Sequence, residues 1–397
     1  MFKREELKLL WPFYLDALIS PMLFFMPAFL IVYFRDLGFN IFQISILTTM
    51  MSLFMLLFEI PTGAIADIYG RKFSVLLGTL IQGIALLSIF FFNNYYFLMF
   101  AFAMVGLGST FNSGAREAWV TDLIKENNRN LLHSYFSKSA SIGGFALLIS
   151  GIIGAVLVKK FGLSVIWIVA GISFLVTFLL LSLAKEKFVR RKVKIRNSFN
   201  KIKEQSFVSI KYAKDHTVLF LFLITSSIIV FAEFFSGDFA WVTLLQELNF
   251  PEYALGYMWS AMGLFGIFAS LLSLKFMKKN KERQFILVAL ILSVIFSVLI
   301  IFVSSFWFAL FVLLSSLFFF QMRRPVERIY FHKFIPNKLR ATVGSVESMA
   351  LSLIGVIAMP LAGLSVDFIG AKYTIFASAF LMIPAVVIYF FINNKKL

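Results

Sequence analysis

The sequence predicts an all-α membrane protein with 12 transmembrane helices in two pseudo-symmetric bundles of six. Three observations predict this fold class: the apolar content, the length of the apolar runs and their grouping along the chain. Of the 397 residues, 60% are hydrophobic and 14% are charged, whereas soluble domains carry about 25% charged residues. Runs of about 20 apolar residues, enough to cross a bilayer as a helix, follow one another almost from end to end. Because these runs are continuously apolar rather than alternating, helices are predicted instead of the strands of a barrel.

The apolar runs fall into two groups of six. We expect helices at residues 10–33, 42–62, 73–92, 95–119, 137–158 and 164–184, and then at 217–242, 253–274, 284–303, 305–328, 343–364 and 371–392. Each run has the length of a membrane span, and no small-residue cleavage site follows the first one, which is therefore interpreted as an uncleaved helix. The predicted domains are 1–184 and 217–397. The basic segment 185–216 joins them, either as a solvated linker or as a helix on anionic lipid headgroups.

The distribution of basic residues predicts the orientation in the membrane. An even number of spans places both termini on one side. If that side is the cytoplasm, the outward loops hold only Arg35, Lys159, Lys160 and Lys372, and the other 33 of the 37 Lys and Arg lie on the inner side. Cytoplasmic loops collect Lys and Arg in this way, so the net charge of +17 indicates a cytoplasmic (inner) membrane protein and no nucleic-acid partner. The lipid bilayer is the expected surrounding.

The two halves of the chain resemble each other. A shift of 211 residues places residues 35–39 over 246–250, and the same shift places Met51, Leu53 and Phe54 over identical residue types at 262, 264 and 265. Each match is weak alone, because Leu and Phe abound. Their common register predicts an internal duplication.

The most informative motif lies at the inner end of the second run. Residues 59–72 contain Glu59, Gly63, Asp67, Gly70, Arg71 and Lys72. Their spacing, Gly-x-x-x-Asp-x-x-Gly-Arg-Lys, closely resembles the signature of the major facilitator superfamily between its second and third helices. The chain length and twofold layout also match, so the resemblance covers essentially the whole chain. The resemblance implies an alternating-access transporter fold.

The resemblance also implies a role for Asp67. In the family this acidic position meets the inner start of the eleventh helix, here residues 342–345, as a latch that stabilises the outward-facing state. Arg71 and Lys72 would join the same charge cluster, while Gly63 and Gly70 would let backbones approach closely. The alternative interpretation is a tight turn with ordinary basic residues.

A second charged group lies at the inner end of the fourth run, at Arg116-Glu117. The 211-residue shift places it over Glu327-Arg328, so the order of the charges is reversed. Ionisable groups near hydrocarbon normally find partners, and Glu59 is a candidate partner for Arg116. We expect Arg116 to pair at a gate, with substrate contact as the alternative. The segments containing Arg129 and Arg340 resemble inner-loop signatures of the superfamily.

Few acidic residues lie inside the predicted spans. They are Asp16 in the first, Glu233 and Asp238 in the seventh, and Glu347 near the start of the eleventh. In the family, helices 1, 4, 7 and 10 line the central cavity, and a desolvated carboxylate there is a natural proton carrier. Glu233 is the first candidate and Asp16 the second. Asp238 is a further candidate, with capping of the outer end of its helix as the alternative. For each of these acids, the alternative to carrying a proton is a structural role in which the carboxylate is neutral or paired.

These features favour a secondary transporter of a small molecule that uses protons rather than a bound cofactor, and the resemblance to the family implies a monomer. Because few buried charges are expected, proton-coupled efflux of lipophilic or amphiphilic compounds is the first hypothesis, and uptake of a small solute is the second. Two departures argue against assigning the chain to the family's drug/proton antiporter branch. The proline that this branch has in helix 5 and the arginine that it has early in helix 4 are both missing here. A non-transporting sensor is a remote alternative.

An enzyme is the other remote alternative. The chain has no cysteine and 3 histidines, His133, His216 and His332, which are scattered in inward loops. No metal-ligand or nucleophile motif occurs. The sequence therefore predicts neither catalytic residues nor a metal site.

Neutralising the acidic position of the motif tests the predicted latch. We expect Asp67→Asn to impair transport more than membrane insertion, because it shifts the balance of states and leaves the spans intact. Flux into vesicles and the yield of inserted protein measure the two effects. Wild-type flux from a well-folded Asp67→Asn protein would contradict the latch.

Overall fold

The computed structural model describes residues 4–124, 129–186, 217–278, 281–333 and 340–391. Within these ranges, 12 helical segments are long and apolar enough to cross a membrane. They agree in number and order with the predicted spans, so the all-α membrane fold class is confirmed. Most of the polar segment expected between the halves, from residue 187 onward, lies outside the described residues.

The spans are built from 15 α-helices and one 3-10 helix among the described residues. The first sequence half contains α1 (Arg4–Leu23), α2 (Met26–Asp36), α3 (Ile41–Tyr69), α4 (Arg71–Phe91), α5 (Tyr95–Asn112), α6 (Ala115–Leu123), α7 (Arg129–Phe161) and α8 (Val165–Ser182). The second half contains α10 (Thr217–Phe235), α11 (Asp238–Glu247), α12 (Ala254–Phe276), α13 (Glu282–Val298), η1 (Leu299–Phe302), α14 (Phe306–Lys333), α15 (Arg340–Ile369) and α16 (Ala371–Phe391).

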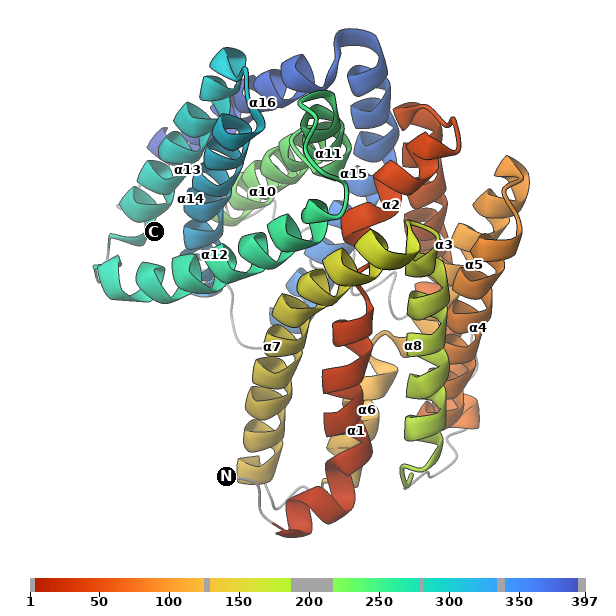
Figure 1. Ribbon diagram of the computed structural model, residues 1–397. Helices are drawn as coiled ribbons and strands as arrows, with labels where there is room; N and C mark the ends of the chain where they lie inside the picture. Colours follow the sequence, from red (N-terminus) through yellow and green to blue (C-terminus); the bar gives the residue numbers. More distant parts are fainter. Residues whose placement is uncertain (1–3, 125–128, 187–216, 279–280, 334–339, 392–397) are drawn as a thin grey trace. The chain divides into compact units, whose positions relative to one another are not determined.

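Three spans that the sequence predicted as continuous are each made of two helices. The first consists of α1 and α2, the fourth of α5 and α6, and the seventh of α10 and α11 (Figure 1). Pro27, at the start of α2, has no N–H to bond to the carbonyl four residues earlier. Gly114 separates α5 from α6 with a φ of 64°, which favours glycine. Gly237 precedes α11 in an extended conformation. Each break places two helix ends inside a span, where their free backbone groups can bind polar groups.

The described chain forms two compact units, and each contains a segment from the other sequence half. The first unit comprises residues 1–33, 50–200 and 253–260, and the second comprises 34–49, 201–252 and 261–397.

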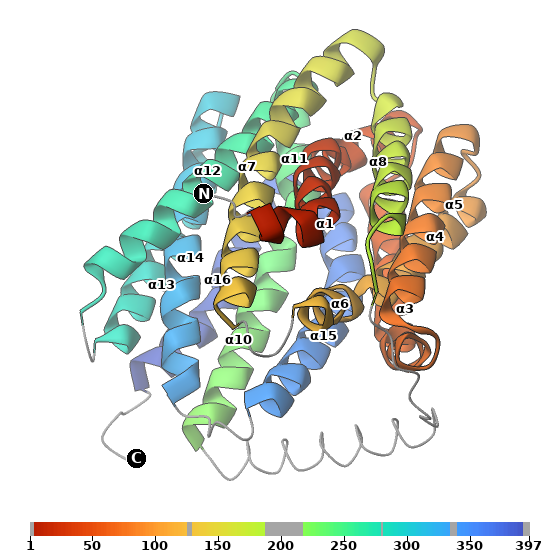
Figure 2. The ribbon, with the colours of Figure 1, turned by 90° about the horizontal axis from the view of Figure 1, so that it is seen from below.

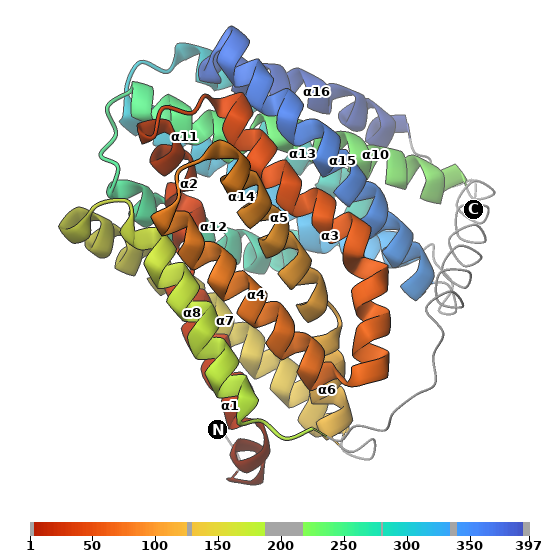
Figure 3. The ribbon, with the colours of Figure 1, turned by 90° about the vertical axis from the view of Figure 1, so that its right-hand side faces the viewer.

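In the first unit, α4 packs against α5 and α8, and α1 packs against α7 and α8. Figure 3 shows α4, α5 and α8 side by side. The core at the end nearest the N-terminus is built around Trp119, whose ring is 1% exposed and meets the edge of Phe13 at 4.9 Å between ring centroids. Trp119 Nε1 donates a hydrogen bond of 2.9 Å to the carbonyl of Lys185. Helix α6 is thereby fixed to the first residue of the polar segment.

In the second unit, α13 packs against α14 and α16, while α10 packs against α15 and α16. Figure 2 shows α13 and α14 as neighbours. The core includes Val326 and Tyr330 of α14 together with Met382 and Tyr389 of α16, all at most 3% exposed. The same core contains Phe222 and Ile229 of α10, and burying these large side chains together fixes the rotation of α14.

The turns after α2 and α11 have the same backbone conformation. Gly38 and Asn249 have φ values of 88° and 58°, in the left-handed region common at helix C-termini. The N–H groups of Gly38 and Asn249 bond to the carbonyls of Arg35 and Gln246 at 2.8 and 3.0 Å. Arg35 Nη1 also donates to Gln246 Oε1 at 2.7 Å, and these two residues are 211 positions apart. The two turns are therefore equivalent under the predicted shift, as an internal duplication requires.

Small residues let helices approach closely at two further equivalent places. In the first unit, a Cβ added at Gly151 of α7 would lie 2.2 Å from the carbonyl oxygen of Gly256 in α12. In the second unit, a Cβ added at Gly363 of α15 would lie 2.3 Å from Ser45 Oγ of α3. The 211-residue shift places Ser45 over Gly256. Both contacts rely on backbones that nearly touch, which only small side chains permit.

Adding one methyl group tests the first of these contacts. We expect Gly151→Ala to destabilise the protein by about 1–3 kcal/mol, because a backbone carbonyl occupies the space that the methyl needs. Gly144→Ala on the same helix is the matched control, because a Cβ there meets no atom within 4 Å. It should be neutral or stabilising by about 0.5–1 kcal/mol. Melting of the purified proteins in detergent measures both, and equal shifts would contradict the close contact.

Candidate functional site

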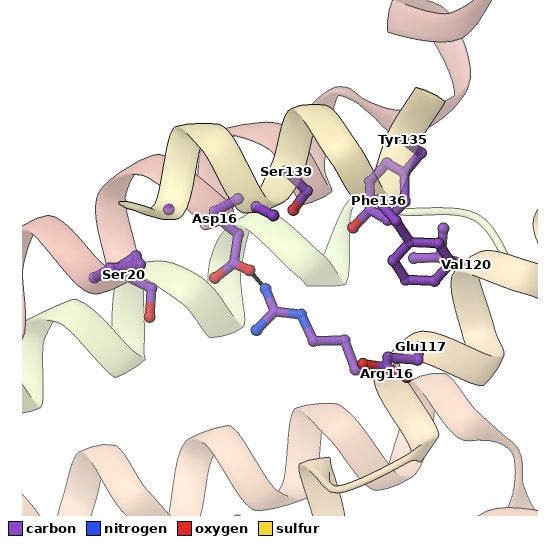
Figure 4. Close-up of a pocket in the computed structure, with 12 residues that line it drawn as sticks. Asp16, Ser20, Arg116, Glu117, Val120, Tyr135, Phe136 and Ser139 are labelled. Atoms are coloured by element: carbon purple, nitrogen blue, oxygen red, sulfur yellow. Dashed lines mark ion pairs between the residues drawn. The ribbon is translucent and has the colours of Figure 1, made fainter. Parts of the chain in front are cut away.

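The first unit contains a pocket of about 370 Å³ between α1, α6 and α7. Half of the 12 lining residues drawn in Figure 4 are polar or charged. They are Asp16 and Ser20 from α1, Arg116 and Glu117 from α6, and Tyr135 and Ser139 from α7.

An ion pair between Asp16 and Arg116 closes one side of this pocket (Figure 4). The Asp16 side chain is 0% exposed and the Arg116 side chain is 35% exposed. Arg116 is the second residue of α6, where the helix dipole disfavours a cation, and a buried carboxylate is unstable without a partner. Each charge therefore compensates the other. The suggested partner Glu59 is not used, because Glu59 instead accepts a 2.7 Å hydrogen bond from Ser113 Oγ.

Glu117 follows Arg116 in the first turn of α6 and also lines the pocket. The helix N-terminus favours an anion at this position. With Asp16, Arg116 and Glu117 in their usual ionisation states, the lining of the first pocket carries a formal charge of −1, because it has two carboxylates and one guanidinium.

The second unit contains a pocket of about 220 Å³ between α10, α14 and α15. Glu233 of α10 and Arg324 of α14 form an ion pair of 2.8 Å inside it. Their side chains are 39% and 51% exposed, so water reaches both charges. The sequence identified Glu233 as the first candidate proton carrier but did not predict Arg324 as its partner.

A more deeply buried group lies beside this pair. Glu327 receives hydrogen bonds from Arg323 on one carboxylate oxygen and from Tyr389 Oη, at 2.8 Å, on the other. Arg323 is 4% exposed, and its guanidinium lies 4.6 Å from the ring centre of Phe320. Arg323 is therefore a buried cation in spans for which the sequence predicted few buried charges. Its position four residues before Glu327 on one helix was a signal for this pairing.

A similar group supports the first pocket. Glu6, which is 2% exposed, accepts hydrogen bonds from Lys138 Nζ at 2.8 Å and from Tyr14 Oη. The Tyr14 ring lies 5.3 Å from the ring of Tyr135, which lines the pocket. In each unit, then, a buried carboxylate held by a cation and a tyrosine hydroxyl stands next to an ion pair that lines the pocket.

The internal duplication relates the two pockets. The 211-residue shift places Arg116 and Glu117 of α6 over Glu327 and Arg328 of α14, and Ala140 of α7 over Leu351 of α15. The pockets are thus built by equivalent helices with the charge order reversed.

The signature motif is tied to its own unit by Arg71 and Lys72. Arg71 Nη1 pairs with Asp122 and donates to the carbonyl of Ala118 at 2.6 Å. Lys72 Nζ donates to two carbonyls at the end of α8, those of residues 182 and 184, at 2.7 Å each. A cation is favourable at such a helix end. The basic residues of the motif therefore brace α4 against α6 and α8.

The other motif positions differ from one another in backbone conformation and in surroundings. Gly70 has φ 107° and ψ 151°, a conformation almost restricted to glycine. A Cβ at Gly63 would meet no atom of the described residues within 4 Å, so a close approach at Gly63 stays a prediction. Asp67 lies partly buried near the end of α3. Its contact with residues 342–345 stays a prediction, because those side chains lie outside the described ones.

The remaining candidates are placed as follows. Asp238 does not cap the outer end of the seventh span but begins α11, directly after the break at Gly237. The side chains of Arg129, Arg340 and Glu347 lie outside the described residues. Among the residues that the structure does describe, no group of three or more His, Cys, Asp or Glu is arranged to hold a metal ion.

The comparisons with known proteins agree on one family. The model described as Major Facilitator Superfamily matches residues 15–346. The chain is 23% identical over 377 residues to the uncharacterized MFS-type transporter YxaM of Bacillus subtilis (strain 168), covering 90% of this chain and 89% of the relative. It is 30% identical over 179 residues to an uncharacterized transporter of Buchnera aphidicola subsp. Schizaphis graminum, covering 42% of this chain and 44% of that relative.

Solved structures share the fold. A bacterial homolog of the human lysosomal transporter Spinster, in an inward-facing conformation, matches with a TM-score of 0.73 and 15% identity, over 98% of this chain and 97% of the other. A D-xylose-proton symporter matches with a TM-score of 0.71 and 14% identity, over 98% of this chain and 99% of the other. At these identities the likeness concerns the fold alone.

Removing one hydroxyl tests the buried group in the second unit. We expect Tyr389→Phe to destabilise the protein by about 1.5–3 kcal/mol, because a hydrogen bond to a buried charged group is lost. Tyr96→Phe is the matched control, since Tyr96 is 79% exposed. Chemical or thermal unfolding in detergent measures the difference. Equal stability of the two variants would show that the Glu327 group contributes nothing to folding.

Proposed function

We propose, from the premise that this chain belongs to the Major Facilitator Superfamily, that this secondary transporter couples the movement of a small polar solute to protons. Family members are integral membrane transporters and not enzymes. Two six-helix halves that alternately expose a site near the middle of the membrane are the general mechanism for such folds.

One observation carries the proposal of proton coupling. Each pocket has a carboxylate–arginine pair, Asp16 with Arg116 and Glu233 with Arg324, on equivalent sets of helices. A carboxylate in a membrane span is stable when it pairs with a cation or when it is protonated. During a transport cycle the carboxylate can therefore separate from the arginine and take up a proton, which changes the charge of the carboxylate. Such an exchange is how the pairs would couple solute movement to a proton gradient.

Glu233 is the first candidate for this exchange and Asp16 the second. Glu233 and its partner are both more than a third exposed, so protons reach the carboxylate through water. Asp16 is fully buried behind Arg116, and it reaches water only after Arg116 moves away. Asp16 is therefore better suited to holding α6 in position while Glu233 titrates.

The pocket linings support a polar solute rather than a lipophilic one. Efflux of lipophilic or amphiphilic compounds was favoured by the sequence because few charges were expected inside the spans. The described pockets contain eight charged side chains between them, at positions 16, 116 and 117 and at 233, 323, 324, 327 and 328. An apolar solute would displace water from these charges without replacing its hydrogen bonds. The second hypothesis, movement of a small polar solute, therefore has the better support, while efflux and antiport stay predictions.

Neutralising Glu233 tests the coupling. Purified protein in liposomes is screened with a panel of polar and lipophilic solutes under an imposed pH gradient, and a dye reports lumenal pH. About 100 mV of proton driving force supports roughly a 50-fold gradient of a solute that moves with one proton. We expect Glu233→Gln to abolish this accumulation while exchange of solute at equal pH persists.

The control for this experiment removes a carboxylate outside both pockets. Glu252 lies exposed in the loop between α11 and α12, so Glu252→Gln should keep the coupled flux. Acidification-driven accumulation that is unchanged in Glu233→Gln would remove Glu233 from the coupling step. Absence of solute flux in the wild type under every gradient would instead favour a sensor that keeps the transporter fold.

A further inference from the structure

We infer that the second pocket is an anion site, in which Arg324 and Arg328 hold the carboxylate or phosphate group of the solute and Glu233 competes with that group for Arg324. The inference rests on the proposed function and deepens it by naming the substrate class. It concerns only residues of the second unit.

The charges in this pocket do not cancel. The charges of Arg323 and Glu327 compensate each other, and Tyr389 donates to the second oxygen of Glu327. Glu233 compensates Arg324. Arg328 has no carboxylate of a described residue within 4.0 Å. The described lining of this pocket therefore has a formal charge of +1, with the excess on the exposed guanidinium of Arg328.

The two arginines are arranged to act together. Arg324 and Arg328 are four residues apart on α14 and both line the pocket, so their side chains lie on one face of the helix. Guanidinium groups present planar sets of donors that match carboxylate and phosphate oxygens. Arg323, one position away, is 4% exposed and is paired with Glu327, so its charge is already compensated. A volume of about 220 Å³ suits a small anion.

Glu233 acts as a built-in competitor for this anion. Its ion pair with Arg324 is exposed to water, and exposed pairs are weak. An entering anion contacts two arginines where Glu233 contacts one, so it can displace the Glu233 carboxylate. Without Arg324, the Glu233 carboxylate sits in the span without a cation and takes up a proton from water. Anion binding and proton uptake are thereby linked at one residue.

The first pocket provides an internal contrast. The duplication places Glu117 where the second pocket has Arg328, and Glu117 also lines its pocket. A carboxylate at that position repels an anion, and the first pocket has a formal charge of −1. Only the second of the two equivalent pockets therefore has the charge that an anion requires.

Binding to the purified full chain tests the inference without any transport measurement. Inorganic phosphate and succinate are titrated by calorimetry in detergent, with chloride at matched ionic strength as reference. We expect both probes to bind more tightly than chloride. Arg324→Gln and Arg328→Gln should each weaken binding by roughly 10- to 100-fold, because a charge-assisted hydrogen bond is lost. Glu233→Gln should strengthen it, because the competitor is gone.

Two further variants keep the outcome decisive. Lys275→Gln removes one positive charge at an exposed position near the end of α12, and it should bind the probes as the wild type does. Arg328→Lys keeps the positive charge and should therefore retain part of the affinity. This result would show that Arg328→Gln weakens binding through the lost charge and not through misfolding. Absence of selective binding in the wild type, or binding by Arg324→Gln and Arg328→Gln as tight as that of the wild type, would overturn the anion site. Weaker binding in Glu233→Gln would do the same.

The result is separable from that of the transport experiment. Selective anion binding without pH-driven flux would leave the anion site standing and defeat the proposed coupling. Coupled flux of an uncharged solute, together with no anion binding, would leave the coupling standing and defeat the anion site.

Discussion

Charge compensation inside an apolar bundle is the constraint on which the rest of this structure depends. A lone carboxylate or guanidinium in a membrane span costs several kcal/mol, and here three buried acids of the described chain each form an ion pair. Glu6 has Lys138, Asp16 has Arg116, and Glu327 has Arg323. These pairs hold helices together in the way that a hydrophobic contact cannot, because lipid competes with apolar packing but not with an ion pair.

The spans were predictable because each one is a long apolar run, and length and hydropathy alone decide whether a segment crosses a bilayer. The breaks in the first, fourth and seventh spans were not. Gly114, Gly237 and Pro27 are residue types that continuous membrane helices also tolerate, since neighbouring groups can satisfy the freed backbone. Whether a span bends or breaks at such a residue depends on tertiary packing that one sequence does not reveal.

The charged residues of the site were predictable from the sequence, but the ion pairs that they form were not. Asp16, Arg116 and Glu233 were identified because ionisable residues are rare inside spans. Depth in the membrane suggested Glu59 as the partner of Arg116, but depth does not specify the rotation of a helix about its axis. The contact of α1 with α7 and α8 places Asp16 beside Arg116, and this rotation follows from the packing of side chains such as Phe13 and Trp119.

The hydrogen bond from the Trp119 indole to the Lys185 carbonyl gives the helix that carries Arg116 a mechanical connection to the rest of the chain. Lys185 opens the segment through which the polypeptide passes from its first six spans to its last six. A tilt of α6 would therefore also move the backbone at Lys185, where that segment begins.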